Sequence, residues 1–143
     1  MHPKQICDEF KALGALIVLD KESLYIENPE KIYPELEELA KTYKSRIIAF
    51  LKGDYTDEKY NIHQTIDKVM NFYDGISQDM NVRINEWLNN DEKSLENVIL
   101  FMIQLWENGW FGMREPICNY ENAETDKLSK EIYDRAMVYF RGQ

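Results

Sequence analysis

A histidine and an aspartate, His63 and Asp67, stand one helical turn apart near the middle of the chain. Side chains at positions i and i+4 share a helix face, so this imidazole and carboxylate could begin a metal site, as in a small metal-dependent hydrolase. A complete site needs a third protein ligand, and no His-x-x-x-His or Glu-x-x-His pattern accompanies the pair. We therefore predict a structural or solvent-facing role for His63 and no metal site.

The remaining reactive side chains show no catalytic pattern. Cys7 and Cys118 are far apart and form no Cys-x-x-Cys pair, which favours buried free thiols over a disulfide. Cys7 and His63 have the residue types of a nucleophile and its base, but nothing in the sequence places them together. The chain contains no Gly-rich phosphate loop, Gly-x-Ser-x-Gly or His-Glu-x-x-His motif. We predict that the protein is not an enzyme and needs no cofactor.

The negative charge is concentrated in one part of the chain. The formal net charge is −9, of which residues 1–53 contribute −1 and residues 54–143 contribute −8. This surplus opposes direct binding to nucleic acid and favours either solubility or a basic protein partner. If a basic partner is bound, the candidate contact residues are Glu86, Glu92 and Glu96.

The elements that must position these residues are mostly helical. Apolar residues at helical spacing predict a helix that Gly14 ends, and another that runs from Pro34 to Gly53. Between them, the stretch "ALIVLDKESLYIE" reads as a β-hairpin. Beyond residue 54 only helical periodicity occurs. We predict an α+β, mostly helical chain with an αββαα module at residues 1–53 and an acidic all-α bundle at residues 54–143.

The stretch "NGWFGMREP" is the most unusual loop in the bundle region. Trp110, Phe111 and Arg114 could form an exposed anchor, because Trp and Arg are enriched at interface hot spots. Alternatively the large apolar residues plug the bundle from its loop, which is the more common fate of such side chains. Trp87 and Trp106 fall on apolar stripes and are predicted to lie in the core.

No apolar run approaches the roughly 18 to 20 residues that span a bilayer, and the first residues lack the pattern of a signal peptide. We expect a cytoplasmic protein that does not enter a membrane.

The first third resembles the TubC-type N-terminal docking domains of hybrid polyketide and non-ribosomal peptide assembly lines. The resemblance covers residues 3–53 and includes the closing segment "LEELAKTYKSRIIAFLKG". The matching positions are Leu13, Gly14, Leu16, Leu24, Pro29, Pro34, Leu36, Leu39, Lys44, Ile47, Ile48 and Leu51.

The resemblance implies a docking module, often a homodimer, whose hairpin receives the C-terminal tail of a partner as an added strand. Leu24, Tyr25, Ile26 and Glu27 would then contact the partner, with Leu24 and Ile26 facing the closing helix and Tyr25 and Glu27 facing the incoming chain. Here an acidic helical region follows instead of a synthetase, which favours a small stand-alone protein of a phage or mobile element.

Two functions remain open at this point. The first is a non-enzymatic adaptor that docks a peptide or a second copy through the hairpin. The alternative is a phage-encoded acidic inhibitor that imitates nucleic acid and blocks a host nucleic-acid-binding enzyme.

Overall fold

The computed structural model describes residues 1–74 and 78–142, apart from the side chains of residues 74 and 78–80. Two compact units are present, Met1–Tyr60 and Asn61–Gln143. The fold is α+β and mostly helical, as predicted, with one small antiparallel sheet. The sequence predicted a division between residues 53 and 54, and this division into domains stays a prediction.

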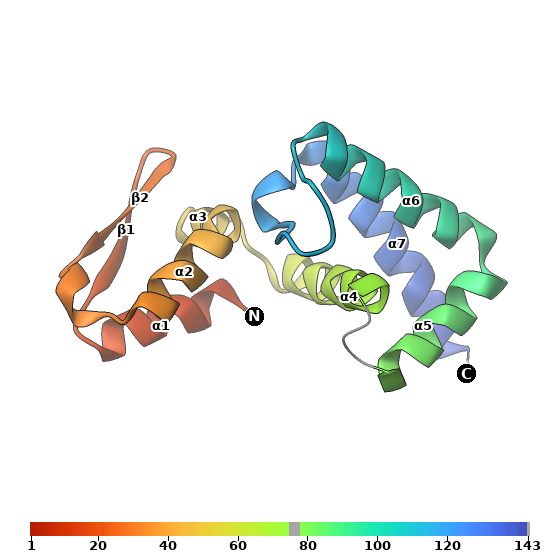
Figure 1. Cartoon of the computed structure of the whole chain (residues 1–143), viewed down its shortest axis with the longest axis horizontal. Helices are drawn as coiled ribbons and strands as arrows, with labels where there is room; N and C mark the ends of the chain where they lie inside the picture. Colours follow the sequence, from red (N-terminus) through yellow and green to blue (C-terminus); the bar gives the residue numbers. More distant parts are fainter. Residues whose placement is uncertain (75–77, 143) are drawn as a thin grey trace. The chain divides into compact units, whose positions relative to one another are not determined.

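The first unit has the predicted order of helix, hairpin and two helices (Figure 1). Its elements are α1 Pro3–Ala12, β1 Leu16–Asp20, β2 Ser23–Glu27, the 3-10 turn η1 Pro29–Lys31, α2 Pro34–Thr42 and α3 Lys44–Leu51. His2 is the N-cap of α1, where its Nδ1 accepts a hydrogen bond from the backbone of Lys4 at 3.0 Å. Gly14 ends this helix at a φ of 87°, in the left-handed region that glycine tolerates best.

Apolar faces of the helices and the hairpin meet in one core. Ile6 and Phe10 of α1 pack with Ile17 of β1, Leu36 of α2 and Ile47 of α3, and all five are buried. A two-stranded hairpin is marginal by itself, so this packing stabilises the sheet by covering its apolar face.

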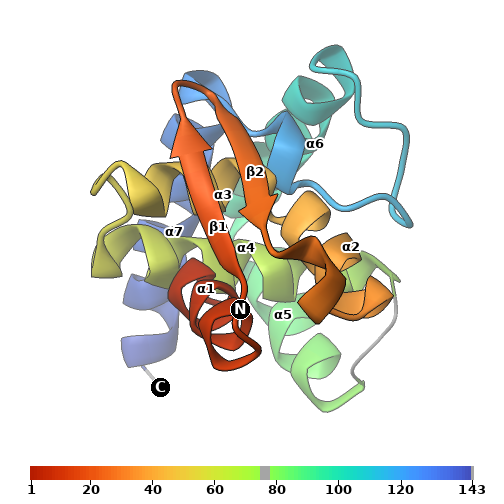
Figure 2. The ribbon, with the colours of Figure 1, turned by 90° about the vertical axis from the view of Figure 1, so that its left-hand side faces the viewer.

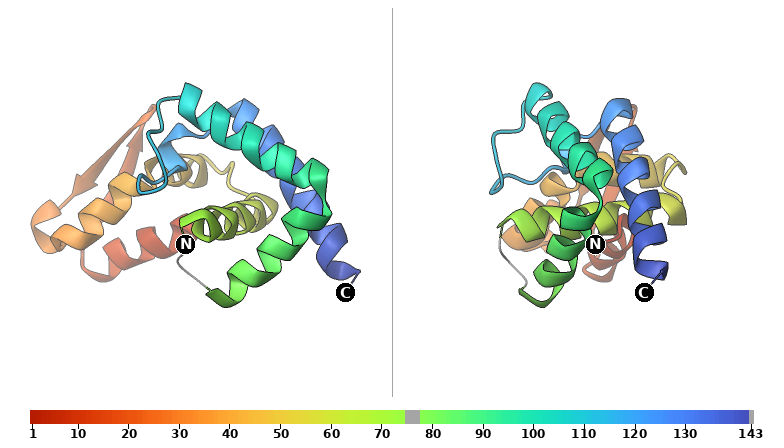
Figure 3. Two further views of the ribbon diagram at one scale, coloured as in Figure 1. Left: turned by 45° about the vertical axis from the view of Figure 1, so that its right-hand side comes forward. Right: turned by 90° about the vertical axis from the view of Figure 1, so that its right-hand side faces the viewer.

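The second unit contains the long helices of the chain. They are α4 Asp57–Asp74, whose first turn belongs to the first unit, α5 Gln78–Asn90, α6 Glu92–Glu107 and α7 Ala123–Arg141, with the 3-10 turn η2 Cys118–Tyr120 before α7. Figures 1 and 3 show α6 and α7 side by side in opposite directions, and this pair makes the most extensive helix contact in the unit. No strand occurs in the described part of the chain beyond residue 56, which confirms the helical prediction.

The core of this unit gathers apolar side chains from all four helices and from the loop before α7. Trp87 is 1% exposed, as predicted, and Phe101, Leu105 and Ile132 are equally enclosed. Among the described helices, none is both long and apolar enough to cross a membrane.

One core prediction is wrong. Trp106 is 66% exposed, and Ile99, Leu100 and Ile103 on the same helix are 41–49% exposed. Apolar residues on nearly every side are typical of a helix surrounded by others, yet α5 and α7 are the only elements with extensive contact to α6 in the described chain. One apolar side of α6 therefore faces solvent.

Candidate interaction surfaces

The register of the hairpin determines which backbone groups of β2 point away from β1. Asp20 pairs with Ser23 across a two-residue loop, and the pairing continues to Leu16 with Glu27. Residues that flank a two-residue loop form a hydrogen-bonded pair, and bonded and non-bonded pairs alternate from there. Tyr25 and Glu27 are therefore bonded to β1, whereas the N–H and C=O groups of Leu24 and Ile26 point outward.

Beside this outward edge lies a groove of about 300 Å³. The groove is lined by Ile17, Leu24, Tyr25, Ile26, Glu37, Ala40, Lys41 and Lys44. Figure 2 shows the hairpin face on, with β2 on the side of α2 and β1 on the side of α1. Residues of β2 therefore line this groove together with Lys41 of α2 and Lys44 of α3.

Side chains alternate along β2 as expected for a half-buried strand. Leu24 and Ile26 are partly buried and pack on the core of the first unit, whereas Tyr25 is 49% exposed and Glu27 is exposed. The burial of Leu24 and Ile26 is as predicted, but the backbone groups that point away from β1 belong to Leu24 and Ile26 and not to Tyr25 and Glu27, which the sequence placed beside an incoming chain. That a partner contacts these four residues stays a prediction.

The loop between α6 and α7 separates its three candidate residues. Trp110 is 5% exposed, and its Nε1 donates a hydrogen bond to the backbone oxygen of Glu115 at 2.8 Å. It is therefore a loop residue that plugs the bundle, and it is not accessible to a partner in this conformation. Phe111 is 82% exposed and Arg114 is exposed, so these two remain available.

The exposed side of α6 combines apolar and acidic residues. Glu92, Glu96, Ile99, Ile103 and Trp106 follow one another at steps of three or four positions, which places them on one helix face, and all are exposed. Glu86 on α5 is also exposed. The sequence singled out the acidic residues but not the apolar stripe that continues from them, although the helical spacing of Ile99, Ile103 and Trp106 is visible in the sequence.

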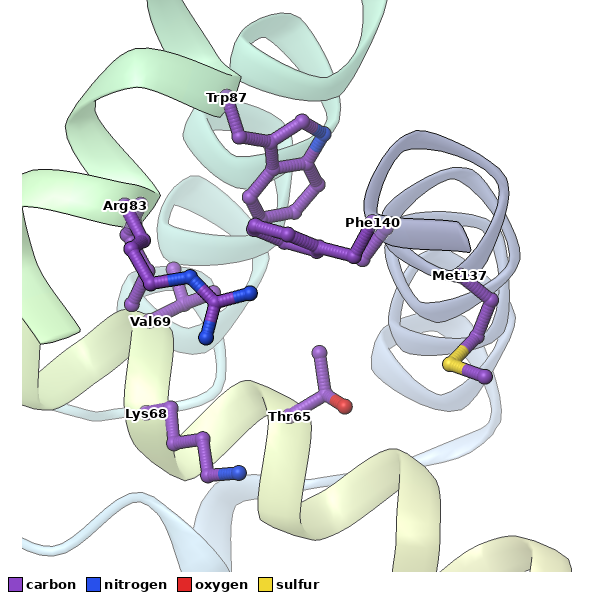
Figure 4. Close-up of a pocket in the computed structure, with 9 residues that line it drawn as sticks. Thr65, Lys68, Val69, Arg83, Trp87, Met137 and Phe140 are labelled. Atoms are coloured by element: carbon purple, nitrogen blue, oxygen red, sulfur yellow. The ribbon is translucent and has the colours of Figure 1, made fainter. Parts of the chain in front are cut away.

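A second cavity, of about 220 Å³, lies among α4, α5 and α7 (Figure 4). Its walls are mainly apolar, with Val69, Trp87, Met137 and Phe140 among them. Arg83 lies over the Phe140 ring, 5.2 Å from its centroid. The cavity offers space for a small apolar group, and its polar lining residues are Thr65 and Lys68 of α4 and Arg83 of α5.

The two cysteines and His63 are the reactive side chains that the sequence singled out. Cys7 and Cys118 are free and buried. Burial raises the pKa of the Cys7 thiol, which favours the unreactive protonated form. His63 does have potential metal-ligand partners, but they are Glu121 and Asp126 rather than Asp67. They were missed because they lie far from His63 in the sequence.

No known protein family, curated protein or solved structure matches this chain in comparisons of sequence and fold. The candidate surfaces must therefore be interpreted from their own chemistry.

Proposed function

We propose that this protein is a non-enzymatic adaptor that binds an extended segment of another protein, or of a second copy of itself, along β2. The observation that carries the proposal is the outward edge of β2 beside a groove. Backbone donors and acceptors on such an edge supply affinity, and side-chain pockets supply selectivity, when an extended segment joins a sheet.

The outward groups of β2 are available for such pairing. No hydrogen bond from outside the hairpin reaches Leu24 or Ile26 within the described chain. Unpaired strand edges readily recruit another strand, and proteins that do not use them usually block them. Here side chains of β2 line a groove, which would receive side chains of an added segment.

The groove also favours a particular chemistry of partner. Lys41 and Lys44 both line the groove. Nζ of Lys41 forms ion pairs with Oε1 of Glu37 at 3.8 Å and with Oε1 of Glu38 at 3.6 Å. Lys44 is exposed and has no carboxylate at ion-pair distance among the described residues. An incoming segment with an acidic side chain or a C-terminal carboxylate near Lys44 would gain a complementary charge.

The exposed side of α6 gives the adaptor a second surface. Contiguous exposed apolar residues next to charged ones commonly mark interaction sites. Trp106 provides an aromatic anchor, and Glu92 and Glu96 favour a basic partner. As part of the same proposal, the protein acts in the cytoplasm, is encoded by a phage or mobile element, and forms a homodimer in solution.

The alternative function, an acidic inhibitor that imitates nucleic acid, is favoured by the −8 charge of residues 54–143. The two functions differ in salt dependence. Binding through imitation of nucleic acid weakens steeply as salt rises, whereas strand addition depends on backbone bonds and apolar contacts and is less sensitive.

A displayed library of random C-terminal peptides tests the proposal. We expect the wild-type chain to select peptides with β-forming residues and an acidic residue or terminus. Ile26→Pro removes an outward N–H group, and Ile26→Ala is its matched control because it loses the same side-chain packing but keeps the donor.

Both variants should remain folded, and selected peptides should bind Ile26→Ala but not Ile26→Pro. Equal binding to both folded variants, or the absence of any selected peptide, would contradict docking at β2.

A further inference from the structure

Three potential metal ligands converge in the second unit from different segments. His63 belongs to α4, Glu121 lies between η2 and α7, and Asp126 is in the first turn of α7. One donor atom from each lies within 4.8 Å of the other two. An imidazole and two carboxylates are a donor set that divalent transition metals accept.

The spacing at the centre of the cluster suits a shared ion. Nε2 of His63 is 3.2 Å from Oε2 of Glu121. Two donors that each lie about 2.1 Å from one metal ion are separated by roughly 3 to 4 Å. The carboxylate of Asp126 completes the set from an exposed position, where a small rotation of its side chain can adjust the third distance.

The backbone on either side of Glu121 is fixed by hydrogen bonds. Asn108 Nδ2 donates to the backbone oxygen of Tyr120 at 2.8 Å, which anchors the residue before Glu121. Asn122 and Thr125 form a reciprocal capping box at the start of α7, with distances of 3.0 and 2.7 Å. Glu121 and Asp126 therefore occupy defined positions before any ion binds, as a metal site requires.

Charge and burial also favour a cation. The side chains of His63 and Glu121 are only 12% and 7% exposed. Two carboxylates next to one imidazole offer anionic donor atoms to a cation. Water screens charge poorly around His63 and Glu121, which strengthens the attraction of Glu121 for a divalent ion.

We propose that His63, Glu121 and Asp126 bind one divalent transition-metal ion, with Zn²⁺ as the best fit to one nitrogen and two oxygen ligands. Water would complete the coordination. The ion would connect α4 to the start of α7. This inference does not depend on the adaptor function, and either can fail without the other.

Calorimetric titration of the untagged, metal-free full chain with ZnCl₂ tests the site. We expect one Zn²⁺ per chain and a Tm that rises by roughly 10 °C when Zn²⁺ exceeds Kd a hundredfold. Mg²⁺ and Ca²⁺ should bind far more weakly, because they prefer sets of oxygen ligands.

Variants identify the ligands. His63→Ala and Glu121→Gln should abolish binding, and Asp126→Asn should weaken it at least tenfold. Glu124→Gln is the matched control, since Glu124 is an exposed acid in the same turn of α7. Asp126→Asn is expected to fold normally because Asp126 is exposed.

Absence of Zn²⁺ binding to the wild-type chain would overturn the proposal and leave the cluster as a plain ion pair. Unchanged affinity in folded Asp126→Asn, or equal loss in Glu124→Gln, would overturn it as well.

Discussion

Asp91 joins the start of α6 to α7. Its Oδ1 accepts a hydrogen bond from the backbone of Ser94 at 3.3 Å, as the N-cap of α6. Arg135 on α7 donates to the same carboxylate, from Nη2 at 2.6 Å and from Nε at 3.1 Å. The Arg135 hydrogen bonds, with help from Ser94, lower the pKa of Asp91 from 3.8 to about 2, although burial acts in the opposite direction.

The lowered pKa of Asp91 shows how much the ion pair with Arg135 can stabilise the folded state. A shift of the pKa from 3.8 to about 2 corresponds to about 2.5 kcal/mol of unfolding free energy. The Arg135 side chain is 45% exposed, so solvent screening reduces the net contribution to about 1 to 2 kcal/mol. Because the folded-state pKa is depressed, this stability is present above about pH 4 and is lost as the pH falls through about 2.

Asp91→Asn isolates the charge, because asparagine is an equally good N-cap. We expect the unfolding free energy of the second unit to fall by about 1 to 2 kcal/mol at neutral pH. Glu92→Gln is the control, since it removes one exposed negative charge at the adjacent position. All three tryptophans, Trp87, Trp106 and Trp110, belong to the second unit, so urea unfolding followed by tryptophan fluorescence reports on this unit.

The pH dependence provides the decisive comparison. The difference in stability between wild type and Asp91→Asn should be constant above about pH 5 and shrink towards zero near pH 2. If the difference is absent at neutral pH, or equals that of Glu92→Gln, the ion pair does not stabilise the unit and the reasoning is refuted.

Three further outcomes are expected. Trp110→Ala should lower the unfolding free energy of the second unit by about 3 kcal/mol or more, because it opens a cavity and removes the hydrogen bond to Glu115. Trp106→Ala should change the unfolding free energy measured in urea by less than about 0.5 kcal/mol, because Trp106 is exposed. Equal losses in the two variants would contradict the difference in burial. Gly14→Ala should lower the unfolding free energy of the first unit by about 1 to 2 kcal/mol, because φ is 87° and the new Cβ would meet Lys31 Cδ at 3.2 Å. Thermal unfolding followed by circular dichroism measures this loss, and an unchanged Tm would contradict it. Charge reversal of Glu86, Glu92 and Glu96 to Lys should slow association with a basic partner more than it speeds dissociation, and unchanged association rates in low salt would refute an acidic contact.

The sequence predicted those elements whose periodicity had a single interpretation. The hairpin followed from "ALIVLDKESLYIE", and the end of α1 followed from Gly14. The exposure of Trp106 could not be predicted, because α6 carries apolar residues on nearly every side and periodicity then does not say which side is covered.

The cluster around His63 escaped prediction for a different reason. Its potential partners, Glu121 and Asp126, are brought to it by the packing of α7 and the preceding loop on α4, whereas sequence spacing reveals only neighbours on the same helix. The open edge of β2 needed the strand register, because a slip of one residue exchanges its inward and outward backbone groups.

Amide hydrogen exchange by NMR tests the edge of β2 most directly. In the free monomer we predict slow exchange at Tyr25 and Glu27, whose amides are bonded to β1, and fast exchange at Leu24 and Ile26, whose amides point outward. When a selected peptide or a second copy binds, Leu24 and Ile26 should become protected. Protection of these two amides already in the free monomer, or unchanged fast exchange in the complex, would contradict docking by strand addition.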